Sequence, residues 1–199
     1  MARSDTPTPA ALALRDQIIA KAEHLFRRFG ASKTTIADIA GALGMSPSNM
    51  YNFFPNKNAI IEAVGERLYD RMRVSVMEII ESRLDPWTKF ERTILTVHRR
   101  LREHLENEPA IMGLLITVEN NGWNFVKNFE KFLLEVLTTA LSVDSKHKLN
   151  LFQDPARTVQ SLLDCVIFGT NIIFISGRDA DEHEQRLHMQ LFLLKKAMR

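Results

Sequence analysis

Apolar residues recur at helical spacing along most of the 199-residue chain, and the residues that break helices fall between those segments. In the first segment, about residues 11–29, Leu14, Ile18 and Ala22 are spaced four apart, and Gly30 follows at the end. Such spacing puts apolar side chains on one face of an α-helix, whereas a strand requires alternation, which is not evident here. The sequence therefore predicts an all-α fold of about nine helices.

The predicted helices fall into two domains behind a flexible N-terminal arm at residues 1–10, which is rich in Pro, Thr and Ser. Residues 11–56 make the first domain and residues 57–199 the second. From their capping and stop signals, helices are predicted at about residues 11–29, 35–43, 47–53, 57–83, 87–106, 109–117, 123–141, 155–176 and 181–198, with a loop at 142–153.

The composition, 45% hydrophobic and 25% charged residues, is that of an ordinary soluble globular protein. The single cysteine, Cys165, cannot form a disulfide within the chain, which excludes a disulfide-stapled secreted scaffold. Its apolar neighbours predict an inert core thiol. No apolar run approaches the roughly 18 residues of a membrane span, and no signal peptide is evident, so we expect a cytoplasmic protein.

The net charge of +2 is unevenly distributed. Residues 1–57 contain seven Lys and Arg against four Asp and Glu, a net charge of +3, and the remainder carries −1. A basic excess at the N-terminal end suits a polyanionic partner there. Three charges do not identify that partner, so the motifs of this region must decide it.

Two short helices joined by a tight turn are predicted within residues 35–54. Thr35, with Asp38 three residues later, resembles a capping box. Gly44 supplies the turn, and Ser46-Pro47 opens the second helix. This pattern predicts a helix-turn-helix, whose second helix enters the major groove of DNA. We expect Ile36, Ile39, Ala40, Leu43, Met45, Met50 and Phe54 to face inward, and Ser48, Asn49, Tyr51, Asn52 and Phe53 to face outward.

A longer set of residues carries a family signal: Phe29-Gly30, Thr34 to Ala40, Gly44-Met45-Ser46, Tyr51, Phe53-Phe54 and Asn56-Lys57. Together and in this order they resemble the TetR family of repressors, over about residues 16–64 without a gap. The resemblance implies a transcriptional repressor that binds DNA through the first domain. It also implies a variable second domain that binds an effector and forms a homodimer.

The same resemblance implies individual DNA contacts. Ser48 and Asn49 would lie near base edges, and Tyr51 would hydrogen-bond a phosphate. Asn52 occupies a position where the family often has His or Trp. Lys57, in a first helical turn with no acid beside it, opposes the helix dipole, and a phosphate would turn that misfit into an attraction. The remaining predicted contacts are Lys33, Thr34, Thr35 and Ser46. The primary role expected of the last three is to cap a helix.

The second domain is predicted to bind a small, apolar effector and to hold the homodimer together. Aromatic and Met side chains between helices are typical of an apolar ligand site as a group, although each alone is more often a core residue. The candidate pocket residues are Met112, Trp123, Phe125, Phe129, Phe132 and Cys165. The candidate dimer residues are Val159, Leu163, Val166, Leu187, Leu191 and Leu194. A two-fold dimer would read a palindromic operator with half-sites roughly 34–36 Å apart.

No cofactor, metal or catalytic site is predicted. The pairs His98/His104 and His183/His188 are six and five residues apart, whereas two metal ligands on one helical face are four apart. No Gly-rich phosphate loop, nucleophile elbow or zinc signature occurs, so we do not expect an enzyme. Two alternatives stay open: a helical enzyme or carrier with an accidental helix-turn-helix pattern, and a DNA-binding activator or global regulator without a ligand.

Overall fold

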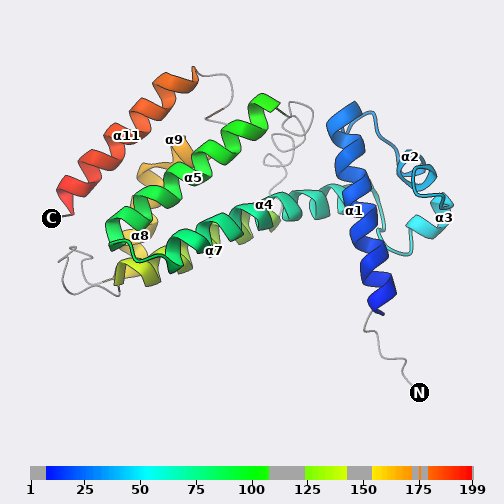
Figure 1. Cartoon of the computed structure of the whole chain (residues 1–199), viewed down its shortest axis with the longest axis horizontal. Coiled ribbons are helices and arrows are strands. Elements are labelled where there is room, and N and C mark those ends of the chain that lie inside the picture. The colour runs from blue at the N-terminus through cyan, green and yellow to red at the C-terminus, as the bar shows by residue number, and fades with distance from the viewer. Residues whose placement is uncertain (1–7, 108–123, 143–153, 172–174, 176–178, 199) are drawn as a thin grey trace.

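The computed structural model describes residues 8–107, 124–142, 154–171, 175 and 179–198, and the regular elements among them are all helical (Figure 1). The predicted all-α fold is confirmed. The helix predicted at 109–117 lies outside the described residues, as does most of the loop predicted at 142–153. The helices are α1 (Pro9–Phe29), α2 (Ile36–Gly41), α3 (Pro47–Met50), α4 (Lys57–Glu81), α5 (Pro86–Asn107), α7 (Asn124–Ser142), α8 (Pro155–Cys165), α9 (Ile167–Thr170) and α11 (Ala180–Ala197).

The N-terminal unit consists of α1, α2 and α3 at one end of the molecule (Figure 1). α1 begins where the Thr8 hydroxyl accepts a hydrogen bond from the backbone N–H of Ala11. It ends at Gly30, whose φ of 82° lies in the left-handed region that glycine adopts without steric cost. Fully buried side chains from all three helices form one apolar core: Ile18, Ala22, Phe26, Ile39, Ala40 and Met50.

α4 connects this unit to the rest of the molecule (Figure 1). It begins at Asn56, whose side-chain oxygen accepts a hydrogen bond of 2.9 Å from the backbone N–H of Ala59, as the sequence predicts. It packs against α1 at one end and lies along α5 and α7 over the remainder. The buried residues of α4 recur at helical spacing, so one face of this helix packs against α1 and against α5 and α7. The residues of this face are Ile60, Ile61, Val64, Leu68, Met72 and Val76.

The remaining helices, α5, α7, α8, α9 and α11, form a bundle around the far part of α4. Each contributes an apolar face to a shared core, and burying one such side chain contributes about 1.5–3 kcal/mol. The buried residues of α5 and α7 include Trp87, Phe90, Ile94, Leu101, Phe125, Phe129 and Leu137.

The long helix predicted at about residues 155–176 is interrupted in the structure. α8 ends at Cys165, Val166 leaves helical geometry with φ −106° and ψ 9°, and α9 spans only Ile167–Thr170. Gly169, three residues after this break, has close partners on two other helices. A Cβ on this glycine would lie 2.6 Å from Leu187 of α11, and its carbonyl accepts a hydrogen bond of 2.9 Å from Nδ1 of His98 on α5.

Candidate nucleic-acid interface

A reciprocal capping box begins α2. The backbone N–H of Asp38 donates to the Thr35 hydroxyl at 3.1 Å, and the backbone N–H of Thr35 donates to the Asp38 carboxylate at 2.7 Å. Hydrogen bonds from the Thr35 side chain and backbone hold the pKa of Asp38 below its ordinary value. The predicted cap is therefore confirmed, with Asp38 in the acidic position of the box.

Thr34 does not reach the surface. Its side chain is only 2% exposed, and its hydroxyl donates a hydrogen bond of 2.9 Å to the Gly30 carbonyl. The prediction that Thr34 meets a DNA phosphate is therefore wrong, because the hydroxyl instead closes the turn between α1 and α2. Lys33 beside it is exposed and lines a cleft of about 470 Å³ together with Arg28 and Phe29.

The turn between α2 and α3 depends on Gly44. Its φ of 65° is left-handed, as the sequence predicts, and the backbone N–H of Met45 returns to the Ala40 carbonyl at 2.9 Å. These two features close the turn after α2, which ends at Gly41.

α3 is a short helix that is held in place by a cap at its start and by buried side chains at its end. The Ser46 hydroxyl accepts a hydrogen bond of 3.2 Å from the backbone N–H of Asn49, and Pro47 occupies the first turn. Met50 and Phe54 are buried, as predicted. Regular α-helix ends at Met50, and residues 51–53 continue as a turn whose N–H groups still bond back to Asn49 and Met50.

The outward side of α3 and its following turn carries a row of polar groups. Ser48, Asn49, Tyr51 and Asn52 are all exposed, and the Tyr51 side chain is 55% exposed. The amide nitrogen of Asn52 donates to the side-chain oxygen of Asn49 at 3.1 Å, a contact that the sequence does not predict. Phe53 departs from the prediction, because it is half-buried and packs on the core.

Lys57 has a partner within the chain. Its ammonium donates a hydrogen bond of 3.3 Å to the Ser32 carbonyl in the loop after α1. The predicted electrostatic misfit at the start of α4 is therefore relieved in part without DNA. An ammonium has three donors, so this bond leaves Lys57 able to reach a phosphate as well.

Arg15 is a surface cation near α3 that sequence reasoning missed. Its guanidinium lies 4.8 Å from the centre of the Phe54 ring, and the residue is exposed. Arg15 lies in α1 and Phe54 in the loop between α3 and α4, so only the fold brings them together.

The structure does not bring the predicted pocket residues together at one site. Phe125 and Phe129 are buried and surround Tyr69 of α4 with ring centres 5.2 and 5.0 Å away. Phe132 stacks on Phe129 at 6.0 Å. Met112 and Trp123 lie outside the described residues.

Cys165 is exposed, so the predicted inert core thiol is wrong. Cys165 is the last residue of α8. It lines a separate cleft of about 720 Å³ between α8 and α11 that includes none of the three aromatic residues.

The predicted dimer residues mostly pack within their own subunit. Val159, Val166, Leu187 and Leu191 are buried in the single chain, and Leu163 and Leu194 are half-buried. Their apolar stripe faces the bundle because α9 and α5 cover it. The exposed apolar residues of α11 lie on its other side: Met189, Phe192 and Leu193.

His98 of α5 and His183 of α11 pack against each other. His98 and His183 are buried with ring centres 5.3 Å apart, and burial lowers the pKa of His98. Within the described part of the chain, no group of three or more His, Cys, Asp and Glu side chains could hold a metal ion. In the same part, no helix is long and apolar enough to cross a lipid bilayer.

Comparisons with known proteins agree with this geometry. A family model described as bacterial regulatory proteins of the tetR family matches residues 18–64. A probable HTH-type transcriptional regulator, ArpR of Pseudomonas putida, is 32% identical over 88 residues, which are 44% of this chain and 42% of that protein. The match thus spans less than half of that curated relative.

Solved structures share the fold over nearly the whole chain. A transcriptional regulator from Cytophaga hutchinsonii superposes with a TM-score of 0.69 at 17% identity, covering 92% of this chain and 97% of that one. A TetR-family regulator from Pectobacterium atrosepticum gives a TM-score of 0.68 at 18% identity, covering 96% of each chain. Residues 18–64, which hold the helix-turn-helix, thus match the bacterial regulatory proteins of the tetR family, and the solved structures share the fold of nearly the whole chain.

Proposed function

We propose that this protein is a cytoplasmic, homodimeric repressor that binds a palindromic operator and is released from it by a small apolar effector. The observation that carries the proposal is the polar row on α3, formed by Ser48, Asn49, Tyr51 and Asn52. These side chains are exposed on a helix whose other face is anchored by the burial of Met50.

The row divides into two kinds of contact. Ser48 and Asn49 lie in the first turn of α3, the part of a recognition helix that meets base edges, and they would provide sequence preference. Tyr51, Lys57 and Lys33 lie around that turn and would bind phosphates, which gives affinity and register but little sequence preference. Thr35 would add a phosphate contact at the start of α2, where the backbone N–H groups of the first turn point outward.

A second copy of the chain supplies the second half-site. Met189, Phe192 and Leu193 follow one face of α11 at spacings of three and four residues, and each is more than half exposed. A monomer rarely leaves such an apolar face uncovered, and pairing it with its symmetry mate would bury it. The interface therefore uses this outward face of α11, with Leu194 and Leu163 at its edge, in place of the inward stripe expected from the sequence.

The effector would act through the contact between α4 and α7. Phe125 of α7 packs directly on Gly65 of α4, where an added Cβ would come within 2.5 Å of the ring. An apolar ligand that wedges into this contact must move one helix relative to the other. A ligand shifts the equilibrium only by its difference in affinity between the two arrangements, so it must bind the displaced one more tightly.

The decisive experiment is selection of DNA from a random library by the purified protein at two salt concentrations. Enrichment of one palindrome is expected, together with an affinity that falls steeply as salt rises, because several phosphates are neutralised. Enrichment of an unpaired half-site would contradict the dimer. Absence of any DNA binding would reject the function itself and favour the enzyme or carrier alternative.

The direction of control requires a separate measurement. A reporter placed behind the selected palindrome should be more active in cells that lack the protein than in cells that contain it. Lower activity in the cells that lack the protein would identify an activator.

A further inference from the structure

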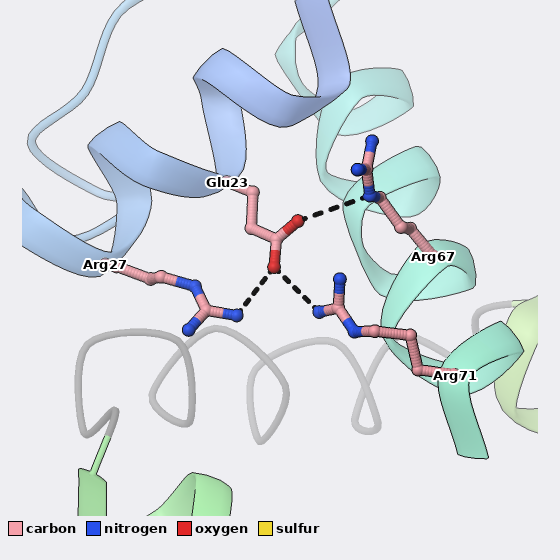
Figure 2. A network of polar contacts seen from close by, with 4 residues as sticks. All are labelled: Glu23, Arg27, Arg67 and Arg71. Carbon is pink, nitrogen blue, oxygen red and sulfur yellow. Dashed lines mark hydrogen bonds and ion pairs between the residues drawn. The ribbon is translucent and has the colours of Figure 1, made fainter. Parts of the chain in front are cut away.

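Glu23 lies at the junction between the N-terminal unit and α4. The residue is only 7% exposed, although it is a carboxylate. It stands on the side of α1 that faces α4, and three arginines surround it (Figure 2). Charged groups are seldom this buried unless they are paired.

The ion pairs of Glu23 join the two helices. One carboxylate oxygen accepts hydrogen bonds from Arg71 of α4 at 2.7 Å and from Arg27 of α1 at 2.6 Å. The other lies 3.6 Å from Nε of Arg67, one turn before Arg71 on α4 (Figure 2). We call these four residues the Glu23 cluster.

The cluster stays ionised. Burial alone would raise the pKa of the Glu23 carboxyl, but hydrogen bonds from Arg71 and Arg27 outweigh it, and the pKa lies below its ordinary value. Each arginine side chain is more than a third exposed, so water and salt weaken the pairs and limit their contribution to stability.

The cluster differs in kind from the apolar contacts around it. Ile18, Phe26 and Val64 belong to the same apolar core, and such contacts attract without fixing a direction. A guanidinium hydrogen bond weakens steeply when its angle changes. Because Arg67 and Arg71 approach one carboxylate from successive turns of α4, a rotation or slide of α1 along α4 would break at least one of these contacts.

We propose that Glu23 is a positioning residue that sets the orientation of the α1–α3 unit on α4, and thereby the separation of the two α3 helices in the dimer. This inference rests on the proposed function. Removing the carboxylate leaves the α1–α3 unit folded and able to bind one half-site. It lowers the affinity for two half-sites at a fixed separation, because the unit is no longer held in one orientation on α4.

The test is DNA binding by the full-length protein to operators whose half-site spacing is varied in single base pairs. Wild type should show a sharp optimum. Glu23→Gln should lose about tenfold in affinity at that optimum and flatten the profile, while binding to an isolated half-site stays within about twofold. The matched control is Glu66→Gln, which breaks the pair with Arg73 at 2.8 Å within α4 and touches no residue of α1 through that bond.

Single arginine variants sharpen the test. Arg71→Gln removes a hydrogen bond of 2.7 Å, whereas Arg67→Gln removes only an ion pair of 3.6 Å. The flattening should therefore be larger for Arg71→Gln. Equal loss of affinity at every spacing and on the isolated half-site, accompanied by a lower melting temperature, would identify a purely structural role and overturn the proposal.

A second measurement does not depend on DNA. Spin labels at Ala42→Cys and Val74→Cys, both exposed positions, report the distance between the N-terminal unit and α4 in a Cys165→Ser background. Labelled chains are diluted with unlabelled ones so that only distances within a subunit count. Glu23→Gln should broaden the distance distribution, and Glu66→Gln should not. An unchanged distribution overturns the proposal, whereas a broadened one in a protein that binds no DNA rejects only the proposed function.

Discussion

The N-terminal unit and the helical bundle share local helix caps, but they differ in how much they depend on close packing between residues far apart in the sequence. Side chains that bond to backbone three residues away start the helices of the N-terminal unit at Thr8, Thr35 and Ser46, and they also start α8 at Asp154 and α11 at Asp179. In the bundle, the arrangement depends on close contacts between distant residues, such as Gly65 with Phe125 and Gly169 with Leu187.

This difference explains why only one region carries a recognisable signature. Local caps are visible as short motifs, and the family model matches residues 18–64. Long-range packing tolerates many residue combinations of similar volume, so a fold can persist while its sequence changes. The solved structures illustrate this, with TM-scores near 0.7 at 17% and 18% identity.

The largest effect is expected where the bundle depends on one close contact. Phe125→Ala should lower the free energy of unfolding by about 3–5 kcal/mol, because it removes a fully buried ring. Gly65→Ala alone should cost about 1–3 kcal/mol, because its methyl group meets that ring. In the Phe125→Ala background the same Gly65→Ala change should become stabilising, by about 1 kcal/mol from helix propensity. Denaturant unfolding of the four proteins measures this, and additive effects would disprove the contact.

The next effect concerns DNA preference in the N-terminal unit. Asn49→Ala should reduce discrimination between operator and mismatched DNA by about 1–3 kcal/mol, because a base contact is lost. Lys57→Ala is the matched comparison: it should weaken binding to every sequence alike and lower the slope of affinity against salt by about one. Titrations at several salt concentrations separate the two. An unchanged salt slope for Lys57→Ala would show that its only partner is the Ser32 carbonyl.

A smaller effect is expected from a local cap. Ser46→Ala should cost about 1 kcal/mol of unfolding free energy, because the N–H of Asn49 loses its acceptor. Ser48→Ala, two residues later and exposed, should change stability by no more than about 0.5 kcal/mol while weakening operator binding. Thermal unfolding of both variants tests the distinction. Equal losses of stability would mean that the hydroxyl of Ser46 is not the determining cap.

The smallest effect should be a pH dependence in the bundle. Burial, reinforced by Arg102 and Arg99, lowers the pKa of His98 in spite of its bond to Gly169 and the nearby Glu184. The folded protein therefore binds this proton less readily than the unfolded chain, whose His titrates near pH 6.5. Stability should be constant above about pH 6.5 and fall as the pH drops below it.

His98→Asn tests this pH dependence, since an amide can still donate to the Gly169 carbonyl. The variant should lose less stability than wild type between pH 7.5 and pH 5.5. His24→Asn, at an exposed position of α1, is the control and should behave as wild type. A steeper loss for His98→Asn than for wild type would reverse the assigned direction of the shift.

The sequence predicts the parts of the interface that local rules decide. Gly30 ends α1 and Gly44 lies in the turn after α2, both in left-handed geometry, and Asp38 completes its capping box. Met50 and Phe54 face inward because their spacing from the capped start of α3 leaves one side available to the core.

Other features could not be predicted because their partners are remote in sequence. Lys57, for example, binds a carbonyl 25 residues earlier. The periodicity of α11 identifies an apolar stripe, but both sides of this helix carry large apolar residues. Which side faces α9 is decided only by the close packing of Leu187 on Gly169.

The hydrogen bond between Asn52 and Asn49 has an evolutionary consequence. A substitution at position 52 frees the Asn49 oxygen and changes what the neighbouring position offers to a base, without disturbing any buried residue. Two positions of the surface that we propose to face DNA therefore change together through one mutation. Duplicated copies of such a gene could acquire separate operators in a single step, long before their folds or their effector sites diverge.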